Sequence, residues 1–396
     1  MKSLLVSGTY FPPQTGGISR YMASICGTLG REEVCCLTGV LRNGSRENKD
    51  WPRVYRRPGA FAKEWHTQAL SFGSAMFQIL LREHPDVVQI AVADEGNIGL
   101  WLWQRFGLPY VVYAHGNEIQ AATRSQWGKP RQSLCQASRV LAVSRFTAGV
   151  VEKAGVSPER IEIVHPGCDV ELFRPHVPNG ALQKSTLSRE RLRRPIILSV
   201  GNLVARKGHD MVIRALPRLL AAVGDVTYLI VGDGPYRPEL EQLASEVGVR
   251  DRVIFAGRMA DEYLPDVYAL CDVVVLASRE RIESGDVEGF GMVYLEAGAT
   301  GKPVVAGRSG GVGDAVIDGE TGVLVDPLSP DAIASAIEMI LLNPDLATRM
   351  GRQGWERTVR EFSWPAVGKQ LREILREVVQ EKARTDASVI RGSSAG

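Results

Sequence analysis

Two glutamates and two glycines fall within the short stretch 286–296, where a predicted helix begins. Glu288 precedes this helix and Glu296 lies about one turn inside it. Eight residues at about 100° each bring both side chains roughly to one side. Gly289 and Gly291 let a backbone come close to a ligand, and the free N–H groups of the helix start favour negative charge there. This combination suits a ligand that carries both hydroxyls and phosphates, and a nucleotide-sugar fits that description.

A purely structural interpretation of this stretch is also open. A glycine-rich turn before a helix is often only a tight turn, and one Glu in a first turn is good capping. The stretch follows an apolar run, 272–278, which predicts a buried strand. Three other polar loops also follow predicted strands, and together they favour a binding site over a simple turn.

The loop 201–208 carries two adjacent cations, Arg206 and Lys207, after a predicted strand. Charge-assisted hydrogen bonds from such side chains are worth about 1.5–3 kcal/mol each. They strengthen as a leaving diphosphate gains charge, which makes them catalytic contacts. A solvated basic loop is the alternative interpretation.

Two loops in the first half are weaker candidates. Gly16 and Gly17 open a predicted helix whose backbone donors suit a diphosphate, although Gly-Gly before a helix is common. His115 follows the predicted strand 110–114 and could donate to a ligand or move a proton, although a lone His is more often structural. We find no Asp-x-Asp pair, so a metal-held diphosphate is not expected and the cations take that role.

The composition is that of an ordinary globular protein of two or three domains, with 396 residues of which 44% are hydrophobic and 23% charged. The net charge of +2 gives no reason to expect nucleic acid as a partner. The six cysteines form no Cys-x-x-Cys pair, so neither a disulfide framework nor a zinc site is expected. No signal peptide or membrane span is evident. We therefore expect a cytoplasmic protein.

Short apolar strands alternate with helices in both halves, which predicts an α/β protein with parallel sheets covered on both faces. The halves are one domain over 1–178 and another over 195–363, joined by a polar linker over 179–194. A helix follows at 364–380, and 383–396 is expected to be a frayed tail. Two doubly wound halves place a ligand cleft between them, at the carboxyl ends of their strands. The predicted strands are 4–8, 34–40, 87–92, 110–114, 140–143, 161–164, 196–200, 226–231, 253–256, 272–277, 304–306 and 322–325.

The stretch 42–63 breaks this alternation because it gathers basic and aromatic residues, and it precedes an amphipathic helix from Trp65 to Leu80. We expect a surface loop and a core-facing helix. The alternative is a patch that rests on an anionic membrane or an anionic acceptor. Its residues are Arg46, Lys49, Trp51, Arg53, Tyr55, Arg56 and Arg57.

Taken together, these motifs resemble the retaining nucleotide-sugar glycosyltransferases of family 4, which have the GT-B fold. The resemblance covers most of residues 1–380. It implies two Rossmann-like domains facing across a cleft, the first binding the acceptor and the second the donor, with helix 364–380 crossing back onto the first. The motifs that carry it, in the family's order, are Phe11-Pro12-Pro13 with Gly16-Gly17, residues 166–175, Arg206-Lys207-Gly208, Gly232-Asp233-Gly234-Pro235, the Glu-x7-Glu signature Glu288–Glu296 and residues 309–322.

The same resemblance implies roles for individual residues. Glu288 would hold hydroxyls of the donor sugar and Glu296 the nucleotide ribose. Lys207 would grip the diphosphate, with Gly16-Gly17 closing over it, and His115 would lie near the anomeric carbon or the 6-hydroxyl of the sugar. The remaining donor candidates are Asn202, Gly257, Arg258, Met259, Phe290, Gly291, Met292 and Val293, and the acceptor candidates are Asp94, Glu95, Asn117 and Glu118.

Asn202 departs from the family pattern, because members often carry Arg at this position. Arg206 is a candidate substitute, but as the neighbour of Lys207 it is expected to point elsewhere. The longer insert 279–286 looks most like mannosyltransferases that extend phosphatidylinositol mannosides, which favours GDP-mannose as the donor.

We therefore predict a retaining hexosyltransferase that needs no metal or other cofactor. It moves mannose from GDP-mannose to a hydroxyl of a glycan or glycolipid, in the cytoplasm or peripherally on the inner face of the membrane. The alternatives are a UDP-sugar-dependent transferase or epimerase of the same fold and a catalytically inactive nucleotide-sugar-binding protein.

Overall fold

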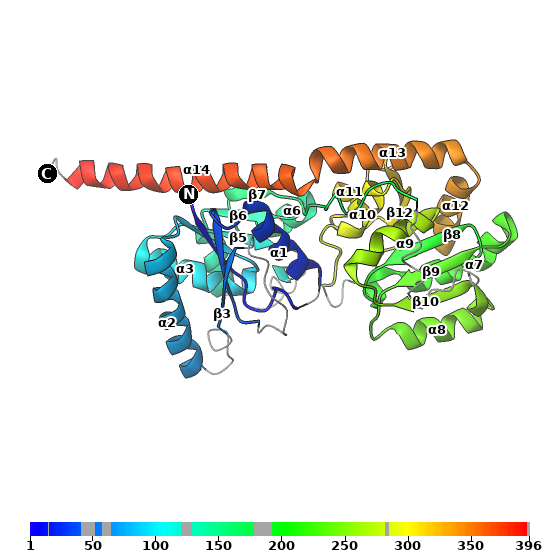
Figure 1. The fold of residues 1–396 in the computed structure, drawn as a ribbon, viewed down its shortest axis with the longest axis horizontal. Helices are drawn as coiled ribbons and strands as arrows, with labels where there is room; N and C mark the ends of the chain where they lie inside the picture. The colour runs from blue at the N-terminus through cyan, green and yellow to red at the C-terminus, as the bar shows by residue number, and fades with distance from the viewer. Residues whose placement is uncertain are drawn as a thin grey trace. The chain divides into compact units, whose positions relative to one another are not determined.

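Each half of the chain builds one parallel β-sheet with helices on both of its faces, as the sequence predicts (Figure 1). The computed structural model describes residues 1–14, 16–40, 52–57, 65–116, 118–119, 129–177, 192–281 and 285–393. Two compact units result. Unit 1 comprises Met1–Pro166 and Trp364–Gly396, and unit 2 comprises Gly167–Ser363.

Unit 1 contains a seven-stranded sheet in the order β3-β2-β1-β4-β5-β6-β7, in which all neighbours are parallel. Most strands are fully buried, because helices cover both faces and the strand sequences are almost continuously apolar. The strands are β1 (Ser3–Val6), β2 (Val34–Thr38), β3 (Arg53–Arg56), β4 (Val87–Ile90), β5 (Tyr110–Ala114), β6 (Arg139–Ala142) and β7 (Ile161–Ile163).

Strand β3 corrects the expectation of a surface loop throughout 42–63. It pairs with β2 at the edge of the sheet, with Cys35 opposite Arg53 and Thr38 opposite Arg56. Glu83 anchors it, because this buried carboxylate accepts hydrogen bonds from Arg53 and from the Tyr55 hydroxyl. Arg53 and Arg56 thus serve the fold, since Arg56 donates to backbone oxygens of its own unit. The rest of this region, 41–51 and 58–64, lies outside the described residues.

The helices of unit 1 follow the predicted apolar spacing. In α1, Tyr21, Met22, Ile25 and Leu29 are buried. The described helices are α1 (Gly17–Leu29), α2 (Trp65–Glu83), α3 (Gly96–Phe106), α5 (Lys129–Gln136), α6 (Arg145–Lys153) and α14 (Trp364–Ser393), with short 3-10 turns η2 (Ala93–Glu95) and η3 (Pro158–Arg160).

The last helix, α14, packs on α1 as the family resemblance implies. Its Arg372 donates to Glu33 at 2.6 Å and to the Thr28 carbonyl at 2.7 Å. The helix runs on to Ser393, beyond residue 383 where we expected a frayed tail (Figure 1). Ala383 and Ala387 favour helix, Lys382 and Asp386 form an i,i+4 ion pair, and neither Gly nor Pro interrupts 369–391.

Unit 2 contains a six-stranded parallel sheet in the order β10-β9-β8-β11-β12-β13. Its strands are β8 (Ile196–Val200), β9 (Thr227–Val231), β10 (Val253–Gly257), β11 (Val273–Leu276), β12 (Val304–Gly307) and β13 (Gly322–Val325). The helices are α7 (His209–Val223), α8 (Arg237–Glu246), α9 (Leu264–Leu270), α10 (Met292–Ala299), α11 (Val312–Ala315), α12 (Pro330–Leu341) and α13 (Pro344–Glu361), with 3-10 turns η6 (Ala205–Lys207), η7 (Arg250–Arg252) and η8 (Asp261–Tyr263).

The chain enters unit 2 after Pro166, earlier than the boundary we placed at residue 178. The segment 167–177 belongs to unit 2 because it packs there: Cys168 N–H donates to the Phe362 carbonyl at 2.7 Å. Farther along, His176 Nε2 hydrogen-bonds Asp266 at 2.7 Å. Of the predicted linker 179–194, residues 179–191 lie outside the described residues.

Both sheets reverse their strand order at one point, between β1 and β4 in unit 1 and between β8 and β11 in unit 2. In open α/β sheets the loops at the carboxyl ends of these two strands diverge and leave a crevice for ligands. The loops that follow β8 and β11 are those that carry Lys207 and Glu288.

Helices α10 and α13 cross closely because glycines line their contact. A Cβ added to Gly351 of α13 would lie 2.1 Å from the carbonyl oxygen of Gly301, a backbone atom that cannot move aside. We expect Gly351→Ala to destabilise unit 2 by about 1–3 kcal/mol, the usual cost of overpacking. Thermal unfolding of the purified chain measures this loss. The matched control is Gly313→Ala, whose Cβ would have no neighbour within 4 Å. Equal midpoints for the two variants would contradict this account of the packing.

Candidate functional site

The cation loop, residues 201–208, is pressed against the end of strand β11. Gly208 makes this possible, because it adopts a φ of 70° and a Cβ there would lie 2.0 Å from the Ala277 carbonyl oxygen. Arg279 holds the loop from the other side, since its N–H donates to the Arg206 carbonyl at 2.8 Å and its guanidinium to Asp210 at 3.0 Å. The loops after β8 and β11 are therefore joined into one rigid edge.

Three side chains from these loops converge on one oxygen of Glu288. Lys207 Nζ donates to Glu288 Oε2 at 2.5 Å, Arg206 Nη1 at 3.0 Å and Ser278 Oγ at 3.2 Å. Lys207 and Glu288 are only 9% and 8% exposed. Two cations thus face one carboxylate in a site with little access to water, which leaves an excess positive charge. Such a site favours a further anion.

Arg206 does not point away from Lys207, so that expectation is wrong. The two residues belong to the 3-10 turn η6, and both side chains reach Glu288 Oε2. The Cα–Cβ bonds of adjacent residues in a tight turn point in different directions. The side chain of Arg206 is long enough to bend back to the carboxylate that Lys207 also binds. Asn202 is exposed on the same loop.

The charged side chains of this site shift the pKa values of Glu288 and Lys207. Burial alone would raise the pKa of Glu288, but Lys207 and Arg206 outweigh it and hold this pKa below its usual value of 4.5. Burial lowers the pKa of Lys207, and the attraction of Glu288 opposes part of this effect. Glu288 is therefore a carboxylate at neutral pH, and both cations bind one of its oxygens.

The residues after Glu288 present backbone N–H groups at the start of α10. Gly291 adopts a φ of 98°, and a Cβ there would clash with the Tyr294 ring at 2.4 Å. From behind, Gly311 N–H donates to the Glu288 carbonyl at 2.9 Å. Phe290 is buried, whereas Met292 and Val293 are half-buried. The loop is thus fixed in a shape that only glycine at 291 permits.

The remaining predicted donor residues lie elsewhere along the same unit. Glu296 is buried inside α10, where its carboxylate accepts a hydrogen bond from the Tyr268 hydroxyl at 2.7 Å. Gly257 ends strand β10 and accepts from Gly232 N–H at 2.9 Å. Arg258 is exposed and Met259 half-buried just after it.

Unit 1 gathers its predicted residues around the ends of β1, β4 and β5. Gly16 is the N-cap of α1, and Gly17 is its first residue. His115 Nε2 lies 2.8 Å from the Ala91 carbonyl, and its backbone N–H donates to Glu118 at 2.5 Å. Asp94 is exposed, and Asn117 lies outside the described residues.

Glu95 stands out among the acidic residues of unit 1. Both of its carboxylate oxygens accept from Gly8 N–H, at 3.0 and 3.1 Å, so it holds the loop after β1. Burial raises the pKa of Glu95 to about 7, while the hydrogen bond from Gly8 opposes the shift and the charge of Asp94 adds to it. A carboxyl group that titrates near neutral pH at a switch point is typical of functional sites.

Sequence reasoning missed the contributions of Ser278 and Arg279. Ser278 ends the apolar run 272–278 and Arg279 follows it, and this position at the carboxyl end of a strand was the available signal. It also missed a buried hydrogen-bond network next to the cation loop, in which His209 Nδ1 lies 3.2 Å from the Tyr228 hydroxyl. This network could not be foreseen, since it joins residues far apart in the sequence.

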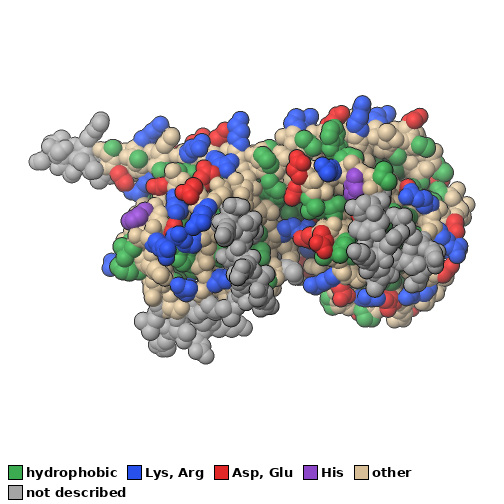
Figure 2. Space-filling model, in the orientation of Figure 1, with side chains coloured by type: hydrophobic (Ala, Val, Ile, Leu, Met, Phe, Trp, Pro, Cys, Tyr) green, Lys and Arg blue, Asp and Glu red, His purple; other side chains and the backbone are tan. Residues whose placement is uncertain are grey.

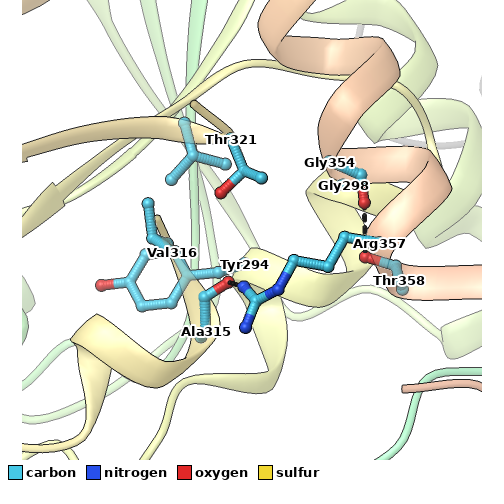
Figure 3. Close-up of a pocket in the computed structure, with 9 residues that line it drawn as sticks. Tyr294, Gly298, Ala315, Val316, Thr321, Gly354, Arg357 and Thr358 are labelled. Carbon is cyan, nitrogen blue, oxygen red and sulfur yellow. Dashed lines mark hydrogen bonds between the residues drawn. The ribbon is translucent and has the colours of Figure 1, made fainter. Parts of the chain in front are cut away.

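A small cavity between α10 and α13 is separate from this site (Figure 3). It measures about 10 Å³, room for one water. Arg357 borders it and donates to the carbonyls of Asp314 and Ala315 at 2.7 and 3.0 Å, which caps the end of α11. The cavity is therefore part of the packing behind α10.

Comparison with known protein families matches both halves of the chain. A model described as glycosyl transferases group 1 matches residues 184–357, and one described as Glycosyltransferase Family 4 matches residues 15–172. The chain is 34% identical over 380 residues to the GDP-mannose-dependent alpha-(1-6)-phosphatidylinositol monomannoside mannosyltransferase of Mycolicibacterium smegmatis, covering 92% of this chain and 96% of that protein. It is 29% identical over 392 residues to the GDP-mannose-dependent monoacylated alpha-(1-6)-phosphatidylinositol monomannoside mannosyltransferase of Corynebacterium glutamicum, covering 94% and 97%.

Solved structures share the fold. HepE from Anabaena, in complex with UDP and glucose, aligns with a TM-score of 0.75 at 21% identity and covers 95% of this chain and 100% of that one. Sucrose-phosphate synthase from Thermosynechococcus elongatus aligns with a TM-score of 0.79 at 24% identity, covering 96% and 100%. At these identities the likeness establishes the arrangement of each sheet and its helices.

The Glu288 ion pairs predict a pH-dependent stability. Because the folded state lowers the pKa of Glu288, its contribution is present above about pH 4.5 and is lost as the pH falls through the lowered value. Glu288→Gln leaves both cations uncompensated, so we expect it to destabilise unit 2 by about 3 kcal/mol or more at pH 7. Urea unfolding should show the difference from wild type shrinking as the pH falls below about 4.5, through the lowered pKa of Glu288. Glu320→Gln, at an exposed position, is the control with no such trend. A difference that stays constant with pH would contradict the assignment.

Proposed function

We propose that this chain, which belongs to the group 1 and family 4 glycosyltransferases, moves mannose from GDP-mannose to a hydroxyl of a glycan or glycolipid, with retention of configuration. The observation that carries the proposal is the pair of cations, Lys207 and Arg206, on the buried carboxylate of Glu288. A nucleoside diphosphate supplies the anion that this site favours, and a sugar supplies hydroxyls for the carboxylate. Relatives named as GDP-mannose-dependent mannosyltransferases support the choice of donor.

Lys207 and Arg206 stabilise the leaving group in this mechanism. The bond between the anomeric carbon and the β-phosphate oxygen breaks, and its electron pair departs with the phosphate. The acceptor oxygen bonds to the anomeric carbon on the same face and passes its proton to the leaving phosphate. The two cations stabilise the charge that develops on the diphosphate, and this is a transition-state contact.

Glu288 and the start of α10 position the sugar. The carboxylate accepts from sugar hydroxyls once the diphosphate draws the cations toward itself, and the N–H groups of Phe290, Gly291 and Met292 assist. Glu296 binds the ribose, and residues 257–259 frame the base. In unit 1, His115 lies beside the reacting sugar and Gly16-Gly17 covers the diphosphate, while Asp94, Glu95, Asn117 and Glu118 contribute to the acceptor side. No metal takes part in this proposal, because Lys207 and Arg206 supply the positive charge that faces the diphosphate.

A transfer assay tests this function. The purified chain is incubated in EDTA with GDP-mannose, UDP-glucose or UDP-galactose and a phosphatidylinositol mannoside acceptor. We expect a mannosylated lipid with an α-linkage, from GDP-mannose alone. Transfer only from a UDP-sugar would show that GDP-mannose is not the donor. Release of an epimerised sugar without acceptor, or no turnover with any donor, would overturn the proposal.

Lys207→Ala should lower kcat about a hundredfold, the usual loss when one charge-stabilising group is removed. Arg214→Ala is the matched control, because this cation is exposed on the following helix, α7. Initial rates at saturating donor measure the effect. Normal turnover of the Lys207 variant would refute the role of this side chain.

We further propose that unit 1 rests peripherally on an anionic membrane at the cytoplasmic face. The described part of the chain contains no helix long and apolar enough to cross a membrane. Helices α2 and α3, joined by the Phe72–Trp101 ring contact at 5.8 Å, nevertheless expose large apolar side chains and cations. Figure 2 shows hydrophobic and basic side chains on the visible face of the molecule. Aromatic side chains beside Arg suit the interface of an anionic bilayer. The exposed residues are Phe77, Leu81, Trp101, Trp103 and Phe106, with Arg82 and Arg105 among them.

Vesicle flotation tests this contact. We expect the chain to float with vesicles that contain phosphatidylinositol and not with phosphatidylcholine alone, and about 0.5 M salt should release it. Phe77→Ser with Leu81→Ser should reduce the bound fraction severalfold. The control is Leu328→Ser with Leu342→Ser, which removes two similarly exposed leucines from unit 2. Equal binding of both double variants would reject this surface.

A further inference from the structure

The chain crosses from unit 2 to unit 1 through three residues, Phe362-Ser363-Trp364, which we call the crossing segment. Phe362 and Ser363 belong to unit 2, and Trp364 begins α14 in unit 1. A single residue therefore separates an aromatic ring of one unit from an aromatic ring of the other. The covalent path between the two rings is therefore short.

On the side of unit 2, the crossing segment touches the donor loop. The buried ring of Phe362 meets the ring of Phe290 edge to face, at 5.8 Å between centroids. Phe290 lies two residues after Glu288, at the start of α10. The guanidinium of Arg357 covers the Phe362 ring at 4.7 Å. Phe362 thus contacts both the donor loop, through Phe290, and α13, through Arg357.

On the side of unit 1, the crossing segment leads to His115. Trp364 stacks on Tyr21 at 5.9 Å, and Tyr21 meets the His115 ring edge to face at 5.8 Å. Tyr21 is buried, and its hydroxyl donates to the Val164 carbonyl at 3.3 Å. The ring contacts therefore run without a gap from the first residue of α14 to His115.

The chain also crosses between the units at Pro166 and Gly167. Residues on both sides of this second connection hydrogen-bond Phe362 or Tyr21. In unit 2, Cys168 N–H donates to the Phe362 carbonyl at 2.7 Å, and Cys168 forms a parallel bridge with Ser363. In unit 1, Tyr21 binds Val164, just before the passage. Residues beside both connections therefore contact Phe362 in unit 2 and Tyr21 in unit 1. Phe362 in turn contacts Phe290, and Tyr21 contacts His115.

We propose that Phe362 and Trp364 are positioning residues that couple the two half-sites, so that nucleotide bound at the donor loop reorients His115. The path is Phe290, Phe362, Trp364, Tyr21 and His115. This inference rests on the proposed function for the roles of its two ends. A contiguous chain of contacts by itself does not establish coupling, so the test measures the response of His115 directly.

Nuclear magnetic resonance of the histidine rings supplies that measurement. The chain has six histidines, and His115→Gln identifies the His115 signal. We expect GDP, which carries no sugar to touch His115, to shift this signal in the wild type. In Phe362→Leu the shift should fall at least about threefold, while the Kd for GDP changes less than about threefold. Trp364→Phe, a milder change that retains a ring, should reduce the shift in the same direction.

The matched control is Phe255→Leu. Phe255 is a half-buried ring of unit 2 that also lies beneath arginine guanidinium groups, at 5.6 and 5.8 Å. We expect it to retain the full His115 shift. In kinetic assays Phe362→Leu should lower kcat about tenfold with an unchanged donor KM, because donor binding survives and alignment of His115 does not.

The outcomes distinguish a failure of the coupling from a failure of the proposed function. A His115 shift of undiminished size in both Phe362→Leu and Trp364→Phe would overturn the coupling. If the wild type transfers mannose but GDP does not shift its His115 signal, the proposed function stands and the coupling is rejected. If GDP shifts the signal as expected but no sugar is transferred, only the proposed function is rejected. If the chain binds no nucleoside diphosphate, both proposals are rejected.

Discussion

The buried excess of positive charge around Glu288 is the constraint on which the site in unit 2 depends. One carboxylate oxygen accepts from Lys207, Arg206 and Ser278, so two cations share a single anion where water has little access. The fold holds them there through backbone packing: Gly208 lies against Ala277, and Arg279 binds the Arg206 carbonyl. Because unpaired buried charge is costly, the arrangement favours an incoming anion and also limits which substitutions the surrounding loops can accept.

The two units repeat one strand order, but the loops at their switch points carry different charged groups. In unit 2 the loop after β8 places Lys207 and Arg206 against Glu288 of the loop after β11, whereas in unit 1 the turn after β4 carries Glu95, whose pKa burial raises to about 7. Strand order alone fixes where a loop can receive a ligand. The side chains on each loop then decide which chemistry it serves. A shared architecture thus provides two different half-sites within one chain.

The sequence predicted the parallel sheets because buried strands form continuous apolar runs, as in 272–277. It predicted Lys207 and Glu288 as partners in one site because each follows such a strand. It failed where the answer depended on distant contacts: β3 forms because Glu83 anchors it, and Arg206 turns to Glu288 through its own long side chain. The neutral-range pKa of Glu95 is also a property of burial, which no local pattern reveals.

Unit 1 is discontinuous in sequence, since its last helix, α14, follows the whole of unit 2. A ribosome therefore releases residues 167–363 as an uninterrupted segment before the residues that cover α1 exist. Domains generally fold as units during synthesis, so unit 2 can reach its native state while the apolar face of α1 still awaits α14. The first half of this chain must then tolerate an interval of incomplete burial in the cell, and a chaperone that shields α1 during translation would act in that interval.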